Sequence, residues 1–260
     1  MTACATLPAL ARYTVGLGDD ALVLAQRCGE WITRAPQLEE DVALANIGLD
    51  LLGQARTLLT YAGQVEGAGR DEDDLAYLRD ERDFLNVQLV ELENGDFAVS
   101  MARLLVFSAY QRELYDRLHG SADETLAAIA AKAIKEVAYH RDHATEWVLR
   151  LGDGTEASHE RMQSGLDTVW PYVDELFTTT GRHGTWPQPD LVSSGDAVDP
   201  EQLREPAMAY VQQVLDEATL AVPAVSWTAT GGRQGIHSLP MGHLLAELQH
   251  IHRSHPGASW

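Results

Sequence analysis

The amino-acid sequence predicts an all-α protein. Apolar residues recur with a period of about 3.6 along the whole chain, and few apolar runs show the two-residue alternation that marks strands. Ala, Leu, Glu and Gln outnumber Val, Ile and Thr in these periodic segments, which favours helices. The chain has 260 residues, of which 45% are hydrophobic, and no linker is long enough to demand a second domain. We therefore expect one helical domain over residues 1–260.

The predicted helices are bounded by residues that favour helix ends. In the first helix, Asp19 or Asp20 is expected as the N-cap, and Pro36 closes the segment. The sixth helix has the strongest start signal, with Asp199 as the N-cap and Pro200 at the first helical position. The expected ranges of the seven helices are Asp19–Thr33, Gln37–Gly63, Phe97–His119, Asp123–Leu151, Ser158–Phe177, Pro200–Leu220 and Pro240–Arg253.

The segments between the long helices carry weaker signals. Gly67–Asp74 is rich in Gly and acidic residues and is expected to be a loop, and Leu75–Phe84 is expected to be a short helical piece. The apolar run Val87–Leu92 is followed by an Asn-Gly turn signal, which allows a short hairpin arm. Thr178–Ala197 is rich in Gly, Pro, Ser and Thr and is predicted to be a loop.

The net charge of −20 disfavours nucleic acid and anionic membrane surfaces as partners, because both repel an acidic protein. The acidic runs at residues 39–41 and 71–74 serve either solubility or the docking of a basic partner. Cys4 and Cys28 belong to no metal-ligand spacing and are expected to be reduced thiols. No apolar stretch reaches about 18 residues and no targeting signal opens the chain, so we expect a cytoplasmic protein.

Two helices resemble a di-iron site that has lost ligands. Helix-bundle di-iron enzymes take a Glu from each of two helices and a Glu-x-x-His pair from each of two others. The matching positions of this chain are Asp50–Gly53 and Glu136–Tyr139, so that Gly53 and Tyr139 stand where a ligand His is expected. Gly cannot bind a metal through a side chain, and neutral Tyr is a poor ligand. The architecture of an oxygenase is therefore expected without its chemistry.

A polar stripe runs through the fourth predicted helix. Glu136, His140 and His143 continue a spacing of three and four residues that is otherwise apolar, and Asp50 of the second helix is a plausible further member. Buried ionisable groups must be paired or neutralised. The four residues therefore form either a metal or proton site, or a hydrogen-bonded network that fixes the packing of the helices.

The glycine-rich segment Thr230–Gly235 is a further candidate site. Its backbone amides and Arg233 could bind a phosphate, but it lacks a preceding strand and the Lys-Ser/Thr of a P-loop. A turn is the default interpretation. The Glu-x-x-His pairs at residues 156–159 and 247–250 carry little weight, because chance alone gives roughly 0.7 such pairs in a chain of this composition.

The chain resembles a known family over nearly its full length. It is similar to the C subunits of the bacterial phenylacetyl-CoA 1,2-epoxidase, a ring-epoxidising oxygenase of phenylacetate degradation. The segments that carry the resemblance are Leu17–Trp31, Asp41–Arg56, Tyr77–Ala98, Ala130–His140, Thr230–His237 and Pro256–Trp260.

The resemblance implies a ferritin-like helical bundle with additional C-terminal helices and a structural role. In this family the C subunit pairs with a homologous A subunit, which carries the di-iron centre, while a reductase subunit supplies electrons from NADPH. No catalytic, cofactor-binding or metal-binding residue can be carried over to this chain. The alternative is a bundle that binds its own metal through Asp50, Glu136 and His140.

The expected contact with the A subunit, or with a second copy of this chain, involves two helices. The helix Gln37–Gly63 is apolar on more sides than one four-helix core requires. The helix Phe97–His119 offers a second apolar set, consisting of Met101, Leu104, Leu105 and Tyr115.

Overall fold

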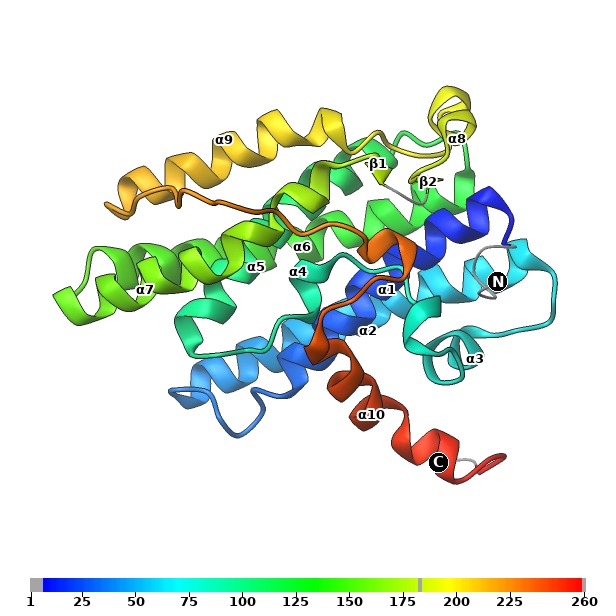
Figure 1. The fold of residues 1–260 in the computed structure, drawn as a ribbon, viewed down its shortest axis with the longest axis horizontal. Coiled ribbons are helices and arrows are strands. Elements are labelled where there is room, and N and C mark those ends of the chain that lie inside the picture. Colours follow the sequence, from blue (N-terminus) through cyan, green and yellow to red (C-terminus); the bar gives the residue numbers. More distant parts are fainter. Residues whose placement is uncertain (1–6, 182–183, 259–260) are drawn as a thin grey trace. The chain divides into compact units, whose positions relative to one another are not determined.

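The computed structural model describes residues 7–181 and 184–258. These residues form helices joined by loops, together with one pair of two-residue strands, β1 (Thr180–Gly181) and β2 (Gly184–Thr185) (Figure 1). The predicted all-α class is therefore confirmed. The chain divides into two compact units; the first comprises Met1–Glu93, Gly181–Leu191 and Gly231–Trp260, and the second comprises Asn94–Thr180 and Val192–Thr230. The expectation of a single domain stays a prediction.

The first unit is built on a hairpin of two long helices, α1 (Ala9–Gly29) and α2 (Leu38–Glu66). The two helices approach closely at glycines, since a β-carbon on Gly18 would lie 2.8 Å from Cδ2 of Leu59 and one on Gly48 would lie 3.2 Å from Cβ of Cys28. The first of these contacts pairs the middle of α1 with the last third of α2. The unit is completed by α3 (Glu72–Tyr77), a 3₁₀ turn (Glu81–Asp83), α4 (Gln88–Glu91), a 3₁₀ turn (Gly232–Gln234) and α10 (Leu239–Ser254).

The start of α1 differs from the prediction. The helix begins at Ala9 with Pro8 in the N-cap position, so Asp19 and Asp20 lie in its middle and both are buried. The N-cap rule recognises an acid before an apolar periodic run. It cannot recognise an acid inside a helix whose partner comes from a distant segment. The prediction that either residue caps the helix is wrong.

The second unit is centred on α5 (Phe97–Leu118), which packs against α6 (Glu124–Gly152), α7 (Glu156–Val169) and α9 (Glu201–Glu217). After α7 the chain continues in 3₁₀ turns at Trp170–Tyr172 and Asp174–Phe177. The N-cap predicted for α6 is confirmed, because the carboxylate of Asp123 accepts a hydrogen bond from the Leu126 amide at 2.8 Å. Sequence signals for caps succeed here because donor and acceptor lie within one turn.

Three further predictions need correction. The segment Val87–Leu92 contains the helical turn α4 and no hairpin arm. The predicted loop Thr178–Ala197 contains the strand pair and a short helix, α8 (Pro189–Ser194). At the start of α9, Pro200 takes the cap position, and the Asp199 carboxylate accepts from the Glu201 amide at 3.1 Å.

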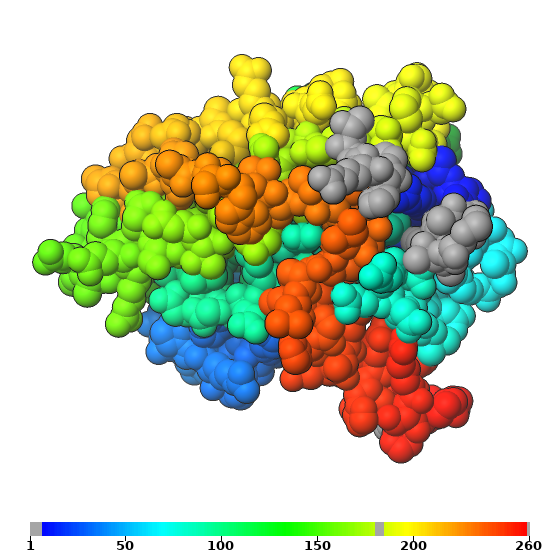
Figure 2. All heavy atoms as spheres, in the orientation of Figure 1, coloured from blue at the N-terminus to red at the C-terminus, as the bar shows by residue number. Residues whose placement is uncertain are grey.

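The last helix, α10, projects from the first unit (Figures 1 and 2). Leu239 and Ile251 of this helix are exposed, whereas Met241 and Leu244 are buried. Cys28 is a buried cysteine of α1 that takes part in no disulfide, and Cys4 lies outside the described residues. Within the described ranges, no helix has both the length and the apolar character that crossing a bilayer requires.

The substitution Gly63→Ala tests the packing at the end of α2. A β-carbon at this position would lie 2.2 Å from the carbonyl oxygen of Arg70, so the backbone of the following loop must move. In an open helix the same change stabilises by about 1 kcal/mol, but here overpacking should destabilise the protein by about 1–3 kcal/mol. Thermal unfolding measures the difference. Gly29→Ala is the matched control, because no atom lies within 4 Å of its β-carbon position; equal effects of the two substitutions would contradict the packing argument.

Candidate functional site

The predicted polar stripe of α6 is shifted from the buried face of that helix. The most buried positions of α6 are small or apolar except for His140, which is the one predicted site residue among them. These positions are Leu126, Ala130, Ala133, Val137, His140, Ala144 and Val148. Glu136 and His143 are half-buried beside this face. Glu136 forms an ion pair with Lys132 one turn earlier, at 3.5 Å. The assumption that all three residues lie on the core stripe is therefore wrong, because the core of α6 is centred one position away from Glu136.

The four residues of the predicted polar network belong to two different units. Asp50 is half-buried on α2 in the first unit, whereas Glu136, His140 and His143 belong to the second. Tyr139, which stands in place of a ligand His, is 47% exposed, and its ring centroid lies 6.0 Å from that of His143. Among the described residues, no group of three or more His, Cys, Asp or Glu side chains has a geometry that could hold a metal ion. The four-residue network stays a prediction.

The structure reveals a different polar cluster, in the first unit, which the sequence did not predict. Asp19 in the middle of α1 accepts hydrogen bonds from both terminal nitrogens of Arg79, one of them at 3.0 Å, and from the Leu85 amide at 2.8 Å. Arg79 is 4% exposed, and its guanidinium lies 4.2 Å from the centroid of the Phe84 ring. One carboxylate of α1 thus fixes the segment that follows α3.

Asp20, the next residue, binds a second arginine from the other end of the chain. Nη2 of Arg233 donates to its carboxylate at 2.6 Å, and the Val87 amide donates at 2.9 Å. Nη1 of Arg233 also donates to the carbonyl oxygens of Gly16 and Leu85, at 2.8 and 2.9 Å. We call Asp19, Asp20, Arg79 and Arg233 the buried ion cluster.

Arg233 is enclosed by an aromatic side chain and by the glycines of its own loop. The guanidinium lies 3.8 Å from the centroid of the Trp186 ring, a cation–π contact. A β-carbon on Gly232 would lie 2.2 Å from the carbonyl oxygen of Asn86, and Gly235 has a φ of 73°. The default interpretation of this segment as a turn is confirmed. The glycines permit close approach to the chain, and Arg233 binds a carboxylate of α1 instead of a phosphate.

Glu91 of α4 holds a second buried group beside this cluster. Its carboxylate accepts from Asn86 Nδ2 at 3.1 Å and lies 2.9 Å from Nδ1 of His237, whose Nε2 lies 3.0 Å from the carbonyl oxygen of Phe84. A carbonyl can only accept, so Nε2 carries a proton, and a second proton is shared between Nδ1 and Glu91. Burial alone would lower the pKa of His237, but the hydrogen bond and charge of Glu91 outweigh it and raise that pKa.

The charges of the buried ion cluster neutralise one another. Asp19 and Asp20 are matched by Arg79 and Arg233, and each carboxylate also accepts a backbone amide. Breaking such a pair leaves an uncompensated charge in the interior. The arrangement can therefore hold loops onto α1, and its polar atoms are used in the hydrogen bonds that do so. The only sequence signal for it was a pair of adjacent acids within an apolar periodic run.

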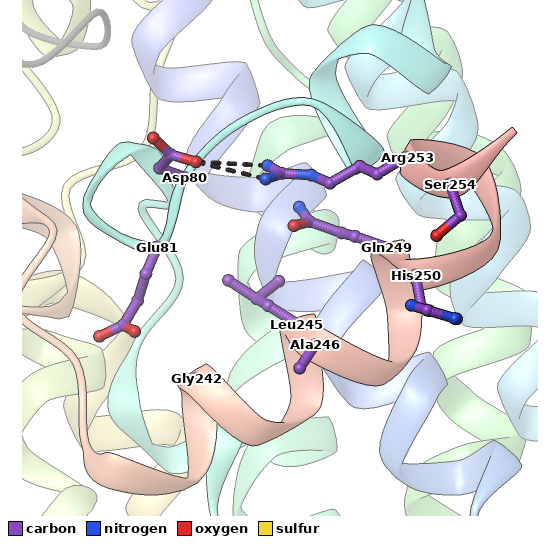
Figure 3. Close-up of a pocket in the computed structure, with 9 residues that line it drawn as sticks. All are labelled: Asp80, Glu81, Gly242, Leu245, Ala246, Gln249, His250, Arg253 and Ser254. Carbon is purple, nitrogen blue, oxygen red and sulfur yellow. Dashed lines mark hydrogen bonds and ion pairs between the residues drawn. The ribbon is translucent and has the colours of Figure 1, made fainter. Parts of the chain in front are cut away.

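A surface pocket of about 330 Å³ lies between residues 80–81 and α10 (Figure 3). Arg253 reaches across to Asp80, with 3.4 Å between guanidinium nitrogen and carboxylate oxygen, and also donates to the carbonyl of Tyr77 at 2.8 Å. Gln249 donates to the carbonyls of Ala76 and Arg79, at 3.1 and 3.0 Å. Glu81 and His250 lie on opposite sides of the pocket. Its convergent polar groups thus attach α10 to the segment after α3.

The expected partner surface on α5 is not available. The four residues singled out on this helix, Met101, Leu104, Leu105 and Tyr115, are at most 3% exposed. They are buried because α5 is the central helix of its unit, so this part of the prediction is wrong. On α2, by contrast, Leu38, Val42, Leu49 and Leu52 are exposed.

Comparison with known proteins places the chain in a family. A family model described as "Phenylacetic acid catabolic protein" matches residues 2–260. The chain belongs to this family. A curated relative, the C subunit of the 1,2-phenylacetyl-CoA epoxidase of Escherichia coli (strain K12), is 47% identical over 253 residues, which cover 96% of this chain and 99% of the relative.

Membership of the phenylacetic acid catabolic family confirms the resemblance seen in the sequence. The all-α architecture is consistent with the ferritin-like bundle expected for this family, in which helical hairpins are joined by a longer connection. The hairpins of this chain are α1–α2 and α5–α6.

Removing the charge of Arg233 should destabilise this family member strongly. The substitution Arg233→Met leaves the Asp20 carboxylate buried without its cation, which costs about 3–5 kcal/mol. Chemical denaturation measures the free energy of unfolding. Arg204→Met is the control, because its ion pair with Asp174 is about half exposed and should contribute less than about 1 kcal/mol. Similar losses for both variants would contradict the importance of burial.

The protonation of Asp20 should make stability depend on pH. Burial raises the pKa of Asp20 from 3.8 to about 6, although Arg233 and the Val87 amide oppose the shift. The folded protein therefore holds this proton more tightly than the unfolded chain, and the stability it contributes is present below about pH 4 and lost as the pH rises through about 6. The difference between these two pKa values corresponds to about 3 kcal/mol in the free energy of unfolding. The raised pKa of His237 acts in the same direction at higher pH.

The measurement is the free energy of unfolding of the wild type and of Asp20→Asn between pH 4 and pH 7. The wild type should lose stability relative to the variant across this range. Parallel curves for the two proteins would show that Asp20 ionises normally in the folded state.

Proposed function

We propose that this chain is a non-catalytic structural subunit of a cytoplasmic, multicomponent phenylacetyl-CoA 1,2-epoxidase, which epoxidises the aromatic ring in phenylacetate catabolism. In this assembly it pairs with and stabilises the catalytic A subunit, which holds the di-iron centre and receives electrons from NADPH through a reductase subunit. The observation that carries the proposal is the 47% identity, over nearly the full length of both chains, to a protein named as the C subunit of this epoxidase.

The residues at the ligand positions support a non-catalytic role. Gly53 offers no side chain, and Tyr139 is 47% exposed and lies beside His143. The residues present at these positions therefore do not fit a di-iron centre, which draws on about four carboxylates and two His. The buried carboxylates Asp19 and Asp20 of the first unit form ion pairs that hold loops onto α1.

The test is co-expression of this chain with the A subunit of the same organism. The two proteins should co-purify, and the iron of the complex should be unchanged when Glu136 and His140 are replaced by Gln and Asn. Elemental analysis after anaerobic reconstitution measures the iron. The chain alone should hold no stoichiometric iron. Iron bound by the isolated chain, and lost in the double variant, would instead support the alternative of a metal site at Asp50, Glu136 and His140.

A further inference from the structure

One face of α2 presents a row of exposed apolar side chains. Leu38, Val42, Leu49 and Leu52 are 75%, 53%, 65% and 45% exposed. With Ala45 between them they follow a spacing of four and three residues, which places them along one side of the helix. We call the four exposed residues the α2 stripe. A row of this kind on a solvent-facing helix is typical of a surface that binds a partner.

An apolar groove runs beside the α2 stripe. It consists of two adjoining pockets of about 350 and 330 Å³, which share Leu22, Leu52 and Tyr77. α2 forms one side of the groove from Ala45 to Leu59, and residues of α1, α3 and α10 form the other side. At a rise of 1.5 Å per residue this is roughly 21 Å, the length of about four helical turns. A ridge of apolar side chains beside a groove of this length fits the packing of one further helix.

Acidic residues lie at both ends of this surface. Glu39 is exposed at the start of α2, where it belongs to the acidic run 39–41. At the other end the groove is lined by Glu72 and Asp73 of the second acidic run. Arg56 of α2 lines the same end and pairs with Glu72 at 3.1 Å, so the exposed Asp73 supplies the negative charge there. The two runs that the sequence suggested could dock a basic partner therefore flank one apolar groove.

We propose that the α2 stripe and its groove bind an amphipathic helix whose apolar face is flanked by basic residues. The charge of the surface decides between two occupants. A second copy of this chain carries a net charge of −20 and would bring the same acidic ends to the contact, so like charges would repel. A helix with Lys or Arg beside its apolar face is complementary at both ends. Resting on the proposed function, the structure assigns this helix to the catalytic subunit.

The first arm of the test uses the two co-expressed subunits. Leu49→Glu places a carboxylate in the middle of the α2 stripe, and Leu239→Glu makes the same change at a residue of α10 that is 82% exposed. The proposal expects co-purification to be lost for Leu49→Glu and kept for Leu239→Glu, with both variants folded by circular dichroism. Full recovery of the complex with Leu49→Glu overturns the proposal and leaves the proposed function intact. If the wild type itself does not co-purify, the proposed function fails and the second arm decides.

The second arm measures binding of a synthetic helix of about 20 residues, with Leu at spacings of three and four and Lys elsewhere. Leu49→Glu should weaken its binding about tenfold or more relative to Leu239→Glu, because the buried carboxylate costs more than the 1.4 kcal/mol that tenfold represents. The two variants have the same net charge, so non-specific attraction cancels. Equal binding to both variants, or equal binding of a peptide with Glu in place of Lys, overturns the proposal. The proposal is also overturned if analytical sedimentation shows that the one effect of Leu49→Glu is to convert a dimer of this chain into monomer.

Discussion

Two neighbouring carboxylates in the middle of α1 impose the main constraint on the first unit. Asp19 and Asp20 are both buried, and adjacent residues of a helix point in different directions, so each needs its own cation. Arg79 supplies one from the segment after α3, and Arg233 supplies the other from the loop before α10. The loop 84–87 is fixed at the same time, because the amides of Leu85 and Val87 donate to these carboxylates. Segments from three parts of the sequence are thus attached to one helix.

The sequence predicts what depends on residues near one another in the chain. The N-cap of α6 at Asp123 and the start of α2 at Gln37 follow from signals within one or two turns, and the structure confirms them. The roles of Asp19 and Arg233 depend on contacts with residues 60 and more than 200 positions away, and no local rule identifies such partners. The predicted core stripe of α6 was misplaced for a related reason. A spacing of three and four residues fits two neighbouring faces of a helix, and packing chooses between them.

The same interactions connect stability with the proposed role as a structural subunit. Buried charges hold the loops of the first unit onto α1, and α1 in turn forms one wall of the groove beside α2. Gly53 and the exposed Tyr139 stand at the two positions where Glu-x-x-His pairs would place a ligand His. What the chain offers instead is a stable helical hairpin with an exposed apolar face. A stable framework of this kind lowers the entropic cost of binding, because little has to be ordered when the partner docks.

The account depends most directly on the claim that the carboxylates of α1 hold the loop 84–87 as firmly as a core element. Amide hydrogen exchange measures this at Leu85 and Val87, whose N–H groups donate to Asp19 and Asp20 at 2.8 and 2.9 Å. The account predicts that both amides exchange as slowly as those in the middle of α1, through opening of the whole unit. Exchange of either amide at the rate of an exposed loop would contradict it.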